Sequence, residues 1–105
     1  MRFFHSRIEP MSEIAVVATF VAKPGQEEKL KEALQGLVGP TLKEPGALQY
    51  DLHRDLKEPR RFVFVERWAS QAALEAHGKA PHIEAHRRNS PALIETGEIH
   101  VLAKL

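Results

Sequence analysis

The segment ALQYDLHRDLKEPRRFVFVERWAS, residues 47–70, predicts two strands joined by a turn and the start of a helix. Residues 47–56 alternate between apolar and polar side chains, which is typical of a strand with one buried face. Lys57-Glu58-Pro59-Arg60 reads as a turn, and residues 61–69 read as a second strand, so the segment predicts a β-hairpin. Ser70 then suits the N-cap of a helix, because its hydroxyl can accept a hydrogen bond from a free amide of the first turn.

The residues before this hairpin predict one strand and one helix. Residues 13–22, EIAVVATFVA, are rich in β-branched side chains and have the length of a buried strand. Lys23-Pro24-Gly25 ends that strand. From Gln26 onward apolar residues recur at helical spacing, and this helix is expected to end near Gly39-Pro40 or to run raggedly to Pro45-Gly46.

The residues after the hairpin predict two helical segments and a last strand. Residues 70–79 read as a helix, and Pro81 suits the first turn of another helical segment, which Pro91 should break or restart. Residues 97–105, GEIHVLAKL, alternate and are expected to form a strand. The resulting order, βαββαβ, predicts an α+β, ferredoxin-like fold, in which an antiparallel sheet carries helices on one face.

Two of the predicted strands are apolar on both faces. Val16 and Val17 are neighbours, and the segment 62–65 is an unbroken apolar run. A sheet with helices on one side only should have a polar second face. We therefore expect the second face to be covered by the sheet of another copy, in a homodimer.

The composition is that of one globular domain and excludes several classes of partner. The chain has 105 residues, of which 43% are hydrophobic and 28% charged, with a net charge of +1. A net charge this small does not indicate binding to nucleic acid or to a membrane surface. No apolar run approaches the ~20 residues of a membrane span. Without cysteine there are no disulfides or thiolate metal sites. We expect a cytoplasmic protein with an N-terminal tail, residues 1–12, and one domain, residues 13–105.

The stretch HGKAPHIEAH, residues 77–86, contains three of the six histidines. His82 and His86 stand four residues apart and could face one metal ion from a helix, but a third ligand is not obvious and no metal is expected. Histidine is the natural base near neutral pH. His77 is the first candidate for that role and His82 the second, although a single histidine on an exposed helix is more often solvated.

In its order of motifs the sequence resembles the antibiotic biosynthesis monooxygenase family of dimeric α+β barrel proteins, over about residues 13–105. The most specific part is Glu66-x-Trp68, followed by a helix with His77 and then by Pro81-His82. The other segments that carry the resemblance are GALQYDL (46–52), FVFVERWAS (62–70) and ALEAHGKAPHIEAH (73–86). The resemblance implies a dimeric α/β barrel and a cofactor-independent oxidation, by O2, of a quinol-like or other small aromatic substrate. Haem-degrading members have an asparagine in the first strand, where this chain has Val17-Ala18-Thr19, so haem is not expected.

The implied chemistry assigns roles to particular side chains. A deprotonated hydroquinone can pass an electron to O2, so the protein must supply a base, an aromatic slot and exclusion of water. By resemblance His77 is the expected base, and Glu66 is expected to orient it or to act as an acid. The expected substrate contacts are Tyr50, Phe64, Trp68, His82 and His86.

Two other functions remain open at this stage. Some relatives isomerise a small phosphorylated sugar derivative, which needs the same base and cations for the phosphate, and four arginines are available: Arg61, Arg67, Arg87 and Arg88. The other is a non-catalytic, dimeric ligand-binding module. In that interpretation Trp68 belongs only to the hydrophobic core, and the histidines face solvent.

Overall fold

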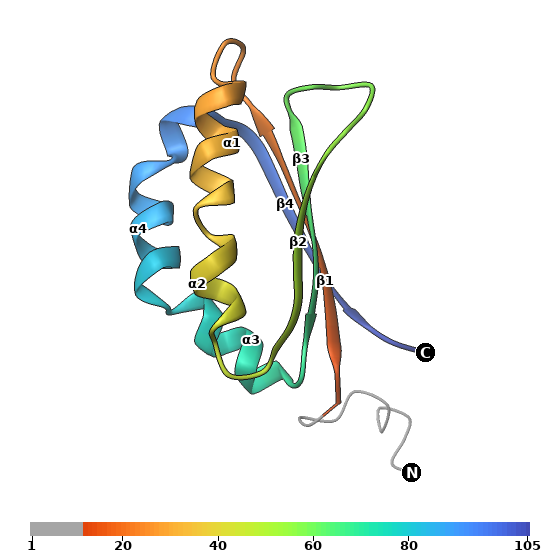
Figure 1. Cartoon of the computed structure of the whole chain (residues 1–105). Coiled ribbons are helices and arrows are strands. Elements are labelled where there is room, and N and C mark those ends of the chain that lie inside the picture. The colour runs from red at the N-terminus through yellow and green to blue at the C-terminus, as the bar shows by residue number, and fades with distance from the viewer. Residues whose placement is uncertain (1–11) are drawn as a thin grey trace.

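The computed structural model describes residues 12–105, and its helices all lie on one face of a four-stranded sheet (Figure 1). The elements are β1 (Ile14–Ala22), α1 (Glu27–Gln35), α2 (Val38–Leu42), β2 (Ala47–Arg54), β3 (Arg61–Trp68), α3 (Gln71–Gly78), α4 (Pro81–Asn89), the 3-10 helix η2 (Pro91–Leu93) and β4 (Ile94–Ala103). The predicted tail over residues 1–12 falls almost entirely outside the described residues. Within the described part, no helix is both long and apolar enough to cross a membrane.

The sheet has the strand order β2-β3-β1-β4, and every neighbouring pair is antiparallel. This confirms the predicted α+β, ferredoxin-like fold. Glu66 on β3 stands opposite Tyr50 on β2 and Val16 on β1, and Val16 stands opposite Val101 on β4. Because directly opposed residues point to the same face, these four side chains form one row across the sheet.

Alternation along β3 separates the two faces of the sheet. Phe62, Phe64, Glu66 and Trp68 are all buried, whereas the residues between them are half-buried or exposed. The buried set faces the helices, where Leu30 of α1 is fully buried against the same core. These four β3 side chains therefore share the face that meets the helices.

Two element boundaries differ in detail from the sequence pattern. The first helix ends at Gln35 and α2 carries the chain past Gly39-Pro40, so the ragged continuation is the alternative observed. Pro40 lies in the first turn of α2, where a missing amide costs no helical hydrogen bond. β4 begins at Ile94 rather than at residue 97, because Ile94 and Thr96 already pair with the end of β1.

Two local features fix the loop before β2 against α3. The Ser70 hydroxyl accepts a hydrogen bond from the Ala73 amide at 3.1 Å, so it caps α3 as predicted. Gly46 has φ +85°, and its carbonyl oxygen accepts from the Ala69 amide at 2.8 Å. A Cβ at Gly46 would lie 2.6 Å from the Ala73 Cβ, so the loop that carries Glu44 approaches α3 as closely as glycine allows.

Candidate active site

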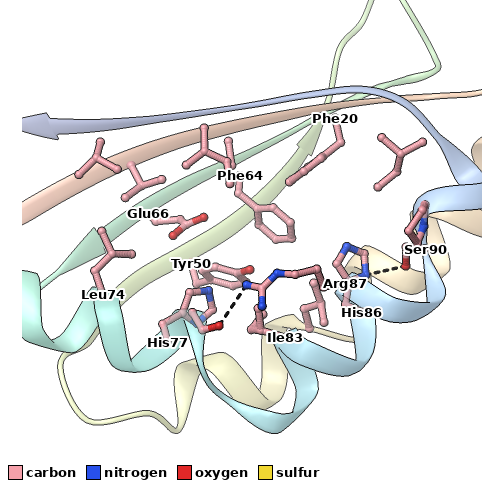
Figure 2. A pocket seen from close by; sticks show the side chains of 18 residues that line it. Phe20, Tyr50, Phe64, Glu66, Leu74, His77, Ile83, His86, Arg87 and Ser90 are labelled. Atoms are coloured by element: carbon pink, nitrogen blue, oxygen red, sulfur yellow. Dashed lines mark hydrogen bonds between the residues drawn. The ribbon is translucent and has the colours of Figure 1, made fainter.

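A cavity of about 590 Å³ lies between the helix-covered face of the sheet and the helices α3 and α4 (Figure 2). Its wall contains five of the seven site residues expected from the sequence: Tyr50, Phe64, Glu66, His77 and His86. On the side of β4 the wall includes Ile94, Ile99 and Val101, and the last two are 63% and 54% exposed. The cavity is therefore open along β4.

Aromatic rings form one wall of the cavity. The rings of Tyr50 and Phe64 stack at 4.5 Å with an angle of 27°, and Phe20 meets Phe64 edge-on at 6.5 Å. All three residues line the cavity. Such a wall offers a flat, apolar surface to a planar substrate.

His77 is buried in the last turn of α3 and is held by a carboxylate. Its Nδ1 lies 2.9 Å from Oε2 of Glu44, and its ring lies 4.6 Å from the Trp68 ring and 5.4 Å from the Tyr50 ring. A carboxylate bound to Nδ1 favours the tautomer with the proton on Nδ1, which leaves the lone pair of Nε2 free. His77 can then accept a proton at Nε2.

Glu66 has a different partner from the one expected. Its Oε1 accepts a hydrogen bond from the Trp68 indole Nε1 at 2.9 Å, while Glu44, not Glu66, binds His77. Burial raises the pKa of Glu66 to about 7; the Trp68 hydrogen bond opposes this rise and the Glu44 charge adds to it. The Glu66 carboxyl group can therefore hold or release a proton near neutral pH.

Tyr50 stays protonated in the cavity wall. Burial, together with the neighbouring Glu66 charge, raises the pKa of its hydroxyl, and Thr41 opposes this rise. Tyr50 is therefore suited to bind an oxygen atom of a ligand by donating a hydrogen bond, and not to act as a base.

His82 and His86 belong to separate networks. The His82 Nε2 lies 2.9 Å from Oγ1 of Thr41 and 3.2 Å from Oε2 of Glu44. The His86 Nδ1 lies 2.8 Å from Oγ of Ser90, and a dashed line marks this hydrogen bond in Figure 2. Burial lowers the pKa of His86, and the nearby Arg87 lowers it further. The two histidines thus do not converge on one ion.

Trp68 and His82 lie behind the cavity wall. Trp68 is fully buried, and its indole packs on His77 and binds Glu66. His82 contacts Glu44 and Thr41, and its ring lies 6.2 Å from the His77 ring. Neither lines the cavity, so each acts on the wall residues and not directly on its contents.

Glu44 was missed by the sequence analysis. It lies in the turn before β2, 33 residues before His77, and no helical or strand spacing connects the two positions. Its neighbours Pro45 and Gly46 indicate only a turn. Arg87, considered above only for a phosphate, lines the cavity and donates from Nη2 to the Gly78 carbonyl oxygen at 3.0 Å.

Proteins of known sequence share this domain. A "Putative monooxygenase" of Mycobacterium tuberculosis, Rv0793, is 33% identical over 76 residues, which are 72% of this chain and 74% of that protein. The isomerase of (4S)-4-hydroxy-5-phosphonooxypentane-2,3-dione from Yersinia enterocolitica is 35% identical over 60 residues, 57% of this chain and 62% of its own length. An uncharacterised protein of Synechocystis is 31% identical over 81 residues, and the match spans 77% of this chain but only 55% of that relative.

Solved structures agree with these sequence matches. The crystal structure of PA3566 from Pseudomonas aeruginosa superimposes with a TM-score of 0.87 at 36% identity, covering 92% of this chain and 98% of that one. Residues 13–89, most of the chain, match the family model described as antibiotic biosynthesis monooxygenase. The chain therefore belongs to the antibiotic biosynthesis monooxygenase family.

Proposed function

We propose that this protein oxidises a quinol-like or other small aromatic compound with O2, without a bound cofactor. The observation that carries the proposal is His77, fixed by Glu44 and bordering a cavity whose wall includes the stacked rings of Tyr50 and Phe64. This arrangement combines a positioned base with a slot for a planar molecule. Membership of the family, and the name carried by the mycobacterial relative, support the same reaction class.

The proposed reaction begins with a proton transfer to His77. Nε2 accepts the proton of a quinol hydroxyl, and the anion passes one electron to O2. The substrate radical and superoxide combine at a ring carbon to form a hydroperoxide. The His77 imidazolium returns its proton to complete the hydroperoxide, and neutral His77 then takes the ring proton. Cleavage of the O–O bond releases hydroxide, which Glu66 protonates, and leaves a carbonyl group. A hydroquinone thus gives up four electrons to O2 and becomes a hydroxyquinone, with one oxygen atom in the ring product and the other in water.

A second candidate is the isomerisation of a small phosphorylated carbonyl compound. Arg87 supplies a cation in the same cavity as His77 and Glu66, and the Yersinia relative is named as an isomerase of such a compound. Proton removal beside a carbonyl by His77 and its return at the neighbouring carbon involves no net oxidation. This reaction consumes no O2, which separates it from the first candidate.

Oxygen uptake by metal-stripped protein over a panel of hydroquinones tests the proposal. We expect uptake above the uncatalysed rate, lost in His77→Ala and kept in His53→Ala, since His53 is exposed on the other face of the sheet. If the whole panel gives no uptake, or if His77→Ala keeps the wild-type rate, the oxygenase proposal is wrong. Turnover of small phosphorylated carbonyl compounds would then favour the isomerase.

We also propose that the protein is a homodimer, joined through the sheet face that the helices leave uncovered. Val17 and Val65 are opposed on that face, and Leu102, which stands opposite Ala15 on the same face, is 45% exposed. Apolar side chains on an open sheet face are stabilised by the same face of a second copy. The proposed dimer keeps the two cavities on opposite sides of the joined sheets.

A further inference from the structure

Three potential metal ligands converge behind the cavity from three separate elements. Glu44 comes from the loop before β2, His77 from the end of α3 and His82 from the first turn of α4. One ligand atom of each lies within 4.8 Å of the others. The Glu44 Oε2 is 2.9 Å from Nδ1 of His77 and 3.2 Å from Nε2 of His82.

These distances are close to those within a metal coordination sphere. A tetrahedral zinc ion bound at about 2.0–2.2 Å holds its ligand atoms about 3.3–3.6 Å apart. The two measured separations are only slightly shorter, so a small outward rotation of the side chains would admit an ion. Two imidazoles and one carboxylate are also a common ligand set for Zn²⁺ with an open fourth position.

The surroundings of the cluster favour a cation. Among the described residues, the ion pairs of Glu44 are with His77 and His82 alone, and its side chain is 14% exposed. A mostly buried carboxylate without a permanent cation gains from a dication. His82 is 21% exposed, so an ion can reach the cluster from solvent, and the Thr41 hydroxyl, 2.9 Å from the His82 Nε2, can bind a water on the ion.

We propose that Glu44, His77 and His82 form a binding site for one divalent transition-metal ion, with Zn²⁺ as the best fit. This site differs from the His82 and His86 pair considered from the sequence, because His86 turns to Ser90. Binding requires both histidines to be neutral and occupies the Nδ1 of His77. The proton of His77 then resides on Nε2, the ring nitrogen that does not bind the ion.

This proposal has a consequence that rests on the proposed function. A His77 that is bound through Nδ1 donates at Nε2 and can no longer take a proton from a substrate. The metal-loaded protein is therefore expected to be inactive as a cofactor-free oxygenase, and removal of the ion restores the base. Zn²⁺ would act as a reversible inhibitor at a site that shares only His77 with the cavity wall.

Zinc binding by the full chain, measured by competition with a chromogenic chelator, tests the site without any substrate. We expect one Zn²⁺ per chain, weakened at least about 10-fold in Glu44→Gln and in His82→Ala. Co²⁺ should give visible absorption bands of a low-coordinate site, and these should vanish in both variants. His100→Ala is the matched control, because His100 lies 3.7 Å from Glu98 in an exposed histidine–carboxylate pair.

Circular dichroism and the zinc-induced change in Tm show that each variant folds and whether it responds to the ion. The proposal is overturned if wild-type protein binds no Zn²⁺ at micromolar concentration, or if folded Glu44→Gln and His82→Ala bind it as wild type does. Oxygen uptake is a separate measurement. If the protein binds zinc but its metal-free form takes up no O2, the oxygenase proposal is wrong and the zinc site stands. If the metal-free form takes up O2 but the protein binds no zinc, the zinc site is wrong and the oxygenase proposal stands.

Discussion

Glu66 is a carboxyl group that the folded protein ionises only near neutral pH. Burial raises its pKa from 4.5 to about 7, so the folded state holds a proton that the unfolded chain has released above pH 4.5. The folded state is therefore favoured below pH 4.5, and this advantage is lost as the pH rises through 7. At one pKa unit per about 1.4 kcal/mol, the loss is on the order of 3 kcal/mol.

Glu66→Gln should remove this pH dependence, because an amide does not ionise. Relative to wild type, we expect the variant to gain free energy of unfolding between pH 4.5 and pH 8, by up to about 3 kcal/mol. Urea denaturation at both pH values measures the change. Glu75→Gln, at an exposed position of α3, should show no such gain. Parallel pH profiles for Glu66→Gln and wild type would contradict the prediction.

Glu44 should act on catalysis through the orientation of His77. Glu44→Gln retains an oxygen for the Nδ1 proton but loses the charge that stabilises the imidazolium form. We expect kcat for oxygen uptake to fall by about 10- to 100-fold with little change in KM. Glu32→Gln, exposed on α1, is the control. A change in KM alone would show that Glu44 shapes binding and not proton transfer.

Sequence reasoning reached some of these residues and not others for a physical reason. Glu66 and His77 stand out because strand alternation places Glu66 beside Trp68, and the helix with His77 follows directly. Glu44 meets His77 only because Gly46 lets the loop approach α3. Such a contact depends on tertiary packing, which leaves no regular spacing in the chain.

At the scale of elements, the strands were easier to predict than their ends. Alternation identified β2, and the apolar run over residues 62–65 indicated β3. The division between α1 and α2 was not predictable from Gly39-Pro40, because Pro40 fits a helical first turn as well as a helix end. The first residues of β4 extend beyond the predicted strand because they pair with β1 across a bulge.

Gly46, immediately before β2, is a position where we expect a substitution to lower the stability of the fold. Gly46→Ala introduces a residue at φ +85° and a Cβ 2.6 Å from the Ala73 Cβ, whereas Gly25→Ala, at φ +82°, meets no atom within 4 Å. We expect Gly25→Ala to cost about 1 kcal/mol of unfolding free energy, and Gly46→Ala at least about 1 kcal/mol more. Urea denaturation of both variants gives the difference. Equal losses would mean that the loop moves away from α3 at no cost.

At the scale of the whole molecule, the proposed dimer can be tested on its exposed side chains. Leu102→Asp places a charge on the uncovered sheet face, and we expect it to produce monomers at micromolar concentration in sedimentation experiments. Leu56→Asp makes the same change at a fully exposed residue of the β2–β3 turn and should stay dimeric. A wild-type protein that sediments as a monomer would refute the dimer.

The row of four side chains across the sheet has a polar half and an apolar half. Tyr50 and Glu66, on β2 and β3, carry the polar chemistry, while Val16 and Val101, on β1 and β4, contribute only shape. Val101 is 54% exposed and stands two strands from Glu66, so changes of its size can alter which molecules enter without disturbing the acid–base groups. In such a scaffold, successive substitutions in the apolar half can change the substrate specificity, while every variant retains the same acid–base groups.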